Sequence, residues 1–188
     1  MSKRKRGARK VPPGKKITQI LLDEQFLMCA SGQGCDSKPH ICQHEAVDDR
    51  ELYAIEALLA AYRAKIALII DQPEVGQYSR VRNFYNNYLE NCRKKGRGQL
   101  PVAAKVLANW LNGRGGRITR MKPASIDSKA LKECNLKPNT LDPLICQLAI
   151  ACRGAAPIWT LDSDFWCASQ FHPEIKPTCP KDALDSLK

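Results

Sequence analysis

The sequence has no long apolar run, and no stretch approaches the roughly 18 consecutive apolar residues that a membrane span requires. The basic start of the chain is not followed by the apolar core of a signal peptide. Histidine is scarce, no local motif supports Ser-His-Asp or Cys-His catalysis, and no phosphate-binding glycine loop of the GxxxxGK type is present. We therefore expect a cytoplasmic protein without a membrane partner.

The chain has a formal net charge of +11, and two stretches without acidic residues carry much of its positive charge. Residues 1–16 carry eight basic side chains and too few apolar ones to order the segment, so we expect a flexible tail. A solubilising role and a nucleic-acid-binding role are equal alternatives for this tail. A second acid-free stretch spans 91–126. We favour RNA contact there over a solvated surface, and the predicted binding residues are Arg93, Lys94, Lys95, Arg97, Arg114 and Arg117.

Cysteine is plentiful but does not form a disulfide pattern. The nine cysteines are an odd number spread along a chain that needs no covalent staples, so we expect mainly reduced thiols. One group contains soft ligands of the kind zinc prefers, namely Cys29, Cys35, His40, Cys42 and His44. Because this group lacks the short paired spacing of common zinc modules, a mobile loop is the default interpretation and a zinc-stabilised interaction module is the alternative.

Strand and helix patterns alternate between residues 17 and 175, which we expect to form one domain with a C-terminal tail at 176–188. Short apolar runs predict buried strands at 17–22, 66–70 and 157–161. Apolar residues at helical spacing fill the segments between them. This alternation predicts an α/β fold, a three-layer αβα sandwich around a central parallel sheet.

Aspartates follow each predicted strand, at Asp23, Asp71 and Asp162. Asp142 opens an apolar helix, and Asp164 lies two residues after Asp162. Because ligands of parallel sheets bind beyond the carboxyl ends of the strands, we expect an acidic pocket there. Hard oxygen ligands of this kind bind Mg²⁺ or Mn²⁺ for phosphodiester hydrolysis. The alternative for each aspartate is a helix cap or turn residue.

The order of these motifs resembles that of the PIN-domain family of metal-dependent ribonucleases. The resemblance covers about 17–171 and is carried by Leu22-Asp23, Leu141-Asp142-Pro143 and Trp159-Thr160-Leu161-Asp162-Ser163-Asp164. It implies an endoribonuclease that binds Mg²⁺ or Mn²⁺ through the residues that also catalyse, Asp23, Asp142, Asp162 and Asp164. It further implies RNA as substrate, with a homodimer and a regulatory protein as additional partners.

Two positions depart from the family pattern. Glu24-Gln25 follows the first aspartate where the family has a small polar residue and Asn, and Gln77 stands where the related branch has a glutamate. An amide keeps the shape of a carboxylate but not its negative charge. Glu24 or Glu74 is the candidate replacement. The alternative function is a catalytically impaired PIN-like protein that binds RNA or a protein partner.

Overall fold

The sheet of the protein has five parallel strands. The computed structural model describes residues 16–34, 42, 46–96, 98–114, 116–138 and 140–188. In the order β3-β2-β1-β4-β5, the strands are β3 (Arg117–Met121), β2 (Ala67–Asp71), β1 (Gln19–Leu22), β4 (Ile158–Trp159) and β5 (Pro177–Thr178). The α/β class and the parallel sheet are therefore confirmed, and the three predicted strands are β1, β2 and β4.

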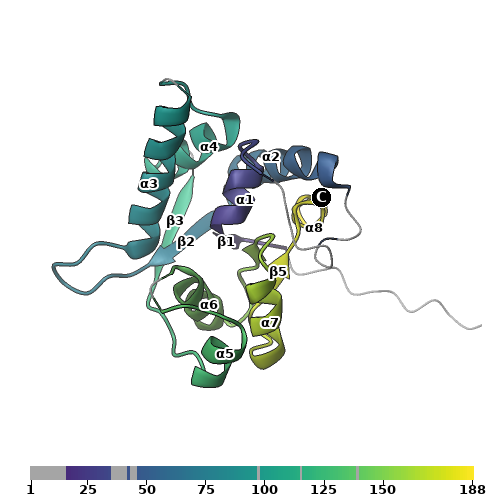
Figure 1. The fold of residues 1–188 in the computed structure, drawn as a ribbon. Helices are drawn as coiled ribbons and strands as arrows, with labels where there is room; N and C mark the ends of the chain where they lie inside the picture. The colour runs from purple at the N-terminus through teal and green to yellow at the C-terminus, as the bar shows by residue number, and fades with distance from the viewer. Residues whose placement is uncertain (1–15, 35–41, 43–45, 97, 115, 139) are drawn as a thin grey trace, which may run out of the picture.

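Helices cover both faces of the sheet (Figure 1). One face carries α1 (Glu24–Cys29), α2 (Val47–Arg63), α3 (Arg80–Lys95), α4 (Val102–Leu111) and α8 (Pro180–Asp185). The other carries α5 (Ser128–Glu133), α6 (Asp142–Ala151) and α7 (Ser163–Phe171). No helix among the described residues combines the length and apolarity that a bilayer span requires.

The two outer strands were not predicted. β3 has the sequence Arg-Ile-Thr-Arg-Met and is only partly buried, so it lacks the apolar run of an interior strand. The segment 176–188, which we expected as a tail, instead forms β5 and α8, and α8 packs against α2. The predicted flexible tail at 1–16 lies outside the described residues apart from Lys16.

The expectation of mainly reduced cysteines is wrong. Cys42 bonds Cys179 and Cys134 bonds Cys167, and a further cysteine, Cys29, is also disulfide-bonded. Among the cysteines that the structure describes, Cys92, Cys146 and Cys152 remain reduced, and all three are buried. Disulfides persist mainly in oxidising compartments, so the pairing weighs against the cytoplasmic prediction without deciding it.

The same pairing weakens the zinc alternative. Cys35, His40 and His44 lie outside the described residues. The sulfur atoms of Cys29 and Cys42, the other two members of the group, are engaged in disulfides. A thiolate is the species that ligates zinc, and a disulfide sulfur is not one.

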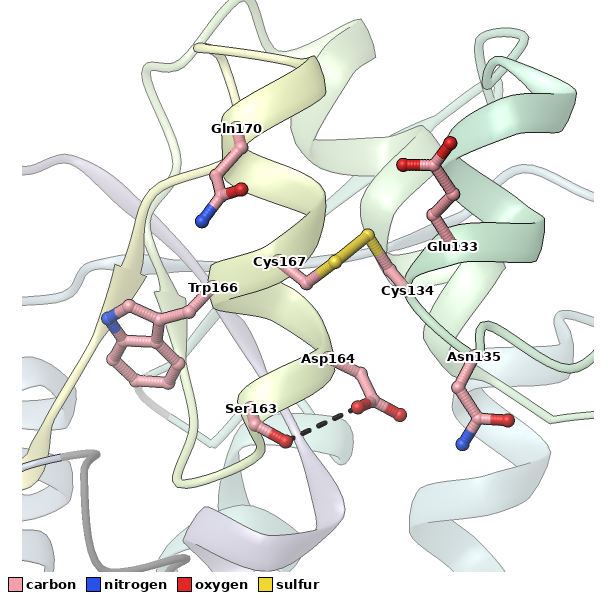
Figure 2. A pocket seen from close by; sticks show the side chains of 8 residues that line it. All are labelled: Glu133, Cys134, Asn135, Ser163, Asp164, Trp166, Cys167 and Gln170. Atoms are coloured by element: carbon pink, nitrogen blue, oxygen red, sulfur yellow. Dashed lines mark hydrogen bonds between the residues drawn. A yellow bond between two sulfur atoms is a disulfide. The ribbon is translucent and has the colours of Figure 1, made fainter.

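Loss of the Cys134–Cys167 disulfide is expected to lower the free energy of unfolding by about 3 kcal/mol, because the bond restricts the unfolded chain. The bond joins the end of α5 to α7 (Figure 2). Urea unfolding of a Cys134→Ser/Cys167→Ser variant under oxidising conditions measures the effect. Oxidised wild-type protein is the comparison, because reductant would also break the Cys42–Cys179 disulfide. A double variant as stable as the oxidised wild type would contradict the expectation.

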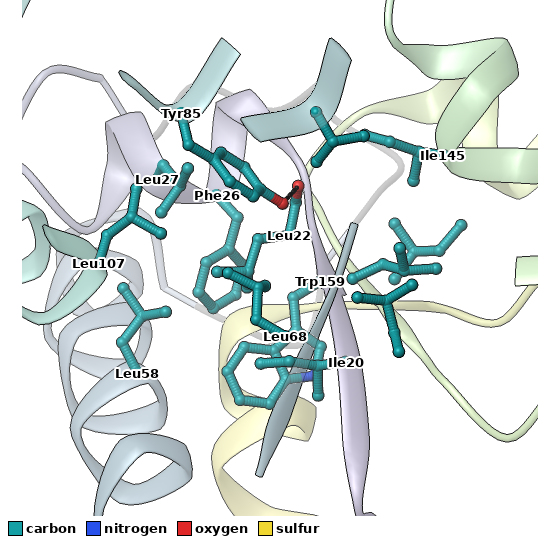
Figure 3. Close-up of a cluster of buried hydrophobic side chains, with 14 of the residues drawn as sticks. Ile20, Leu22, Phe26, Leu27, Leu58, Leu68, Tyr85, Leu107, Ile145 and Trp159 are labelled. Atoms are coloured by element: carbon teal, nitrogen blue, oxygen red, sulfur yellow. Dashed lines mark hydrogen bonds between the residues drawn. The ribbon is translucent and has the colours of Figure 1, made fainter. Parts of the chain in front are cut away.

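The core lies between the sheet and the helices on both of its faces, with Ile145 of α6 on the second face (Figure 3). Phe26 packs on Trp159, with 5.4 Å between ring centroids, which ties α1 to β4. The Tyr85 hydroxyl of α3 donates a 2.9 Å hydrogen bond to the carbonyl of Leu22, the last residue of β1. The Tyr85 bond fixes the carboxyl end of β1, and the Phe26–Trp159 contact lies at β4, the strand that pairs with it there.

Strand order places a crevice at the carboxyl edge of the sheet. From β1 the chain proceeds outward to β2 and β3 over one face, then returns to β4 and β5 over the other. The connections therefore diverge between β1 and β4, which is where open parallel sheets bind ligands. Asp23 directly follows β1, and Asp162 lies three residues beyond β4.

Candidate active site at the carboxyl edge of the sheet

Three of the four predicted aspartates share one cleft at this point. The cleft has a volume of about 360 Å³. Asp23, Asp142 and Asp162 line it together with a fourth carboxylate, Glu24. The remaining lining comes from Gln25, Phe84, Thr140, Leu141 and Ile145. The expected convergence of Asp23, Asp142 and Asp162 from distant parts of the sequence is therefore confirmed.

Asp23 is the most buried of these carboxylates, with 4% of its surface exposed. Asp23 caps α1 by accepting a hydrogen bond from the backbone N–H of Gln25. Its carboxylate also accepts a 2.8 Å bond from the Thr160 hydroxyl. Burial raises the pKa of Asp23 to about 7, and the nearby charges of Asp142 and Asp162 add to the rise. The carboxyl is therefore partly protonated near neutral pH, and a cation in the cleft would favour its charged form.

Asp142 has no role as a helix cap. It is the first residue of α6, the cap position belongs to Leu141, and no side chain caps the helix. Its Oδ2 accepts a 2.9 Å hydrogen bond from the Thr140 hydroxyl. Burial raises the pKa of Asp142, and the charges of Asp162 and Asp164 raise it further. The capping alternative is thus wrong for this residue.

Asp162 both caps a helix and faces the cleft. Its Oδ1 accepts a 3.0 Å bond from the Asp164 amide at the start of α7, and its Oδ2 accepts a 2.9 Å bond from Gln25 Nε2. The Asp162 amide donates to Thr160, whose hydroxyl donates in turn to Asp23. Thr160 and Gln25 therefore hold the two carboxylates in a fixed relation.

Glu24 is the site residue that the predicted set omitted. As the first residue of α1 it lines the cleft, and burial and the charge of Asp142 raise its pKa. Gln77 and Glu74 are both exposed, and neither lines the cleft. The structure therefore favours Glu24 over Glu74 as the additional carboxylate.

Asp164 does not line this cleft. It lies in a neighbouring cavity of about 360 Å³ beside Asn135, Glu133 and the Cys134–Cys167 disulfide (Figure 2). Its charge still raises the pKa of Asp142. Asp164 is therefore part of the electrostatic surroundings of the cleft and not of its wall.

Asp71, at the end of β2, has a structural role. It accepts hydrogen bonds from the Ser79 hydroxyl at 2.6 Å and from the amides of Arg80 and Val81 at 3.0 and 2.9 Å. All three donors belong to the first turn of α3 and its cap. These bonds engage both carboxylate oxygens and fix the start of that helix.

The predicted RNA-binding residues do not border the cleft. Arg93, Lys94 and Lys95 form the last turn of α3, about 20 Å along the helix from the end that contacts Asp71. Arg114 and Arg117 lie at the opposite, amino edge of the sheet, and Arg97 lies outside the described residues. The basic side chain beside the cleft is one we did not predict, Arg80, whose Nη2 donates to the Thr140 carbonyl at 3.3 Å.

The donor chemistry of the cleft fits Mg²⁺ or Mn²⁺. Four carboxylates supply hard oxygen ligands, and three of them, Asp23, Glu24 and Asp142, have raised pKa values that a divalent cation would reverse. Among the described residues, no three His, Cys, Asp or Glu side chains are already grouped around one metal position. Carboxylates repel one another without a cation, so a spread arrangement is expected of the metal-free cleft.

Comparison with known proteins gives no relative for this chain. No protein-family model, no curated protein and no solved structure matches it.

Proposed function

We propose that this protein is a PIN-like, divalent-metal-dependent endoribonuclease that hydrolyses RNA phosphodiester bonds at the carboxylate cleft. The observation that carries the proposal is the gathering of Asp23, Glu24, Asp142 and Asp162 where the sheet topology forms its ligand crevice. The motif order of the PIN-domain family supports the same assignment. Because Asp142 has no capping role, a functional role accounts best for its partly buried charge.

Asp23, Asp142 and Asp162 would hold Mg²⁺ or Mn²⁺, which neutralises charge on a bound phosphate and orients the attacking water. The chain itself orients these carboxylates through hydrogen bonds from Thr160, Gln25 and Thr140. Arg80 places a positive charge beside the acidic cleft, where it can attract the phosphate backbone of RNA.

Cleavage of a labelled RNA in Mn²⁺ and in EDTA tests the proposal. We expect cleavage in Mn²⁺ and none in EDTA, with isothermal calorimetry showing Mn²⁺ binding by the intact chain. Equal cleavage in both buffers would remove the metal mechanism.

A catalytically silent RNA-binding or partner-binding protein is the second candidate. One observation favours it: the side-chain amide of Gln25 is hydrogen-bonded to Asp162, one of the proposed metal ligands. The silent candidate predicts RNA binding without Mn²⁺ binding and without cleavage.

Glu24 and Gln77 give a paired prediction. Glu24→Gln is expected to weaken Mn²⁺ binding by about 10-fold or more, because it removes a negative charge from the cleft wall. Gln77→Glu is expected to leave Mn²⁺ binding unchanged, because Gln77 is exposed and away from the cleft. Calorimetric titration with Mn²⁺ measures both. Tighter binding by Gln77→Glu would restore Gln77 to the site.

A further inference from the structure

Basic residues line up along the amino edge of the sheet, opposite the carboxylate cleft. Four lie at or within three residues of the start of β3, β2, β1 and β5, and Arg153 lies five residues before β4. From β3 across to β5 they are Arg117, Lys65, Lys16, Arg153 and Lys176, which we call the basic rim. The rim draws its charges from five separate segments of the chain, so no single charge run in the sequence reveals it.

Two neighbouring cavities lie along the basic rim. One, of about 610 Å³, is lined by Lys65 and Arg117. The other, of about 390 Å³, is lined by Lys176 and the backbone around Gly154. Both cavities share the segment 16–18. The two cavities therefore adjoin at the start of β1, and we call them together the groove.

The groove carries positive charge that the described residues do not neutralise. No acidic side chain lines either cavity. Lys188, which also lines the larger one, pairs with Asp185 at 2.6 Å, and Lys176 Nζ donates to the Gly154 carbonyl at 2.8 Å. Lys16, Lys65 and Arg117 are exposed, and no described carboxylate lies within ion-pair distance of them.

The dimensions suit a polyanion. Neighbouring strands lie about 4.8 Å apart, so the five strand starts span about 20 Å, longer than one phosphate group requires. The groove offers the hydroxyl of Thr18 and no exposed large apolar side chain, since the exposed ones described are Leu52, Val75, Tyr78 and Val102. A surface that inserts into lipid would carry such side chains.

We propose that the basic rim binds the phosphate backbone of an RNA strand, at a site separate from the carboxylate cleft. Lys16, Lys65 and Arg117 supply the contacts, and the rim binds without regard to base sequence because phosphates are identical along the strand. In the sequence, Lys16 ends the basic stretch 1–16, which contains no acidic residue. The proposal does not depend on catalysis at the cleft.

Fluorescence anisotropy of a labelled oligouridine strand in EDTA, across a series of KCl concentrations, tests the rim. The test variant is Lys65→Asn/Arg117→Gln; Asn is chosen because residue 65 has a φ of 56°, which Asn tolerates. Removing two phosphate contacts is expected to reduce the slope of log K against log salt by about 1.4. The matched control, Lys129→Gln/Lys132→Gln, removes the same charge from exposed sites on α5 and is expected to keep the wild-type slope.

If the test and control variants show the same slope of log K against log salt, the proposal that the rim binds RNA is wrong. Loss of binding to phosphatidylserine vesicles, with RNA binding unchanged, overturns it in favour of a membrane surface. If the test variant does not fold, Lys16→Gln/Arg117→Gln is the second variant; it also removes two of the named contacts, so the same slope change is expected. Failure of this proposal can be distinguished from failure of the proposed nuclease activity. Cleavage of an oligonucleotide too short to reach the rim from the cleft tests the nuclease activity alone.

Discussion

Asp142→Asn is expected to abolish RNA cleavage while leaving the fold intact. The amide keeps the size of the side chain and can still accept the hydrogen bond from Thr140, but it removes one negative charge from the cleft. Mutation of a residue that hydrogen-bonds to a metal ligand lowers metal affinity by about 10- to 100-fold. Loss of a carboxylate that itself binds the metal is therefore expected to lower Mn²⁺ affinity by more than about 100-fold. In EDTA the same substitution is expected to raise thermal stability, because it relieves repulsion with Asp162 and Asp164.

Single-turnover cleavage rates and calorimetry with Mn²⁺ measure these effects. Asp127→Asn is the matched control, because Asp127 caps α5 outside the cleft and the change is again carboxylate to amide. Asp164→Asn adds a second comparison, since Asp164 affects Asp142 by charge alone and should have the smaller effect. Wild-type rates in Asp142→Asn would remove Asp142 from the mechanism. A wild type that binds RNA but never cleaves it in Mn²⁺ would favour the silent candidate.

The interior of the fold is predictable from the sequence, and its edges are not. β1, β2 and β4 are apolar runs because neighbouring strands and helices bury them. β3 is half-solvated and carries two arginines, and β5 has two residues and starts with a proline. Neither segment has a period or an apolar run to detect, so their places in the sheet depend on pairing with β2 and β4.

The aspartates of the site are predictable because each one marks the end of a strand or the start of a helix. Asp164 was assigned to the same cleft because it is two residues from Asp162, but helical residues turn by about 100° each, so the start of α7 directs Asp164 into the next cavity. Glu24 reaches the cleft because α1 begins directly after Asp23. Disulfides such as Cys42–Cys179, 137 residues apart, depend on the folded chain and leave no local signal.

Asp23 is expected to make the stability of the metal-free protein depend on pH. Its ordinary pKa of 3.8 applies to the unfolded chain, and burial raises the pKa to about 7 in the folded protein. The folded state therefore binds the proton more tightly, and the stabilisation is complete below about pH 4 and lost as pH rises through about 7. From the size of the shift, the expected loss is roughly 4 kcal/mol.

Urea unfolding in EDTA at a series of pH values measures this loss. Asp23→Asn is expected to flatten the curve over the same range, because the amide has no proton to lose and its oxygen can still accept the bonds from Thr160 and Gln25. Mn²⁺ is expected to stabilise the wild type most at high pH, where the charged carboxylate is available to bind it, and to act little on Asp23→Asn. A wild-type curve as flat as that of the variant would show that Asp23 is not the titrating group, and stabilisation of both proteins by Mn²⁺ to the same extent would place the cation elsewhere.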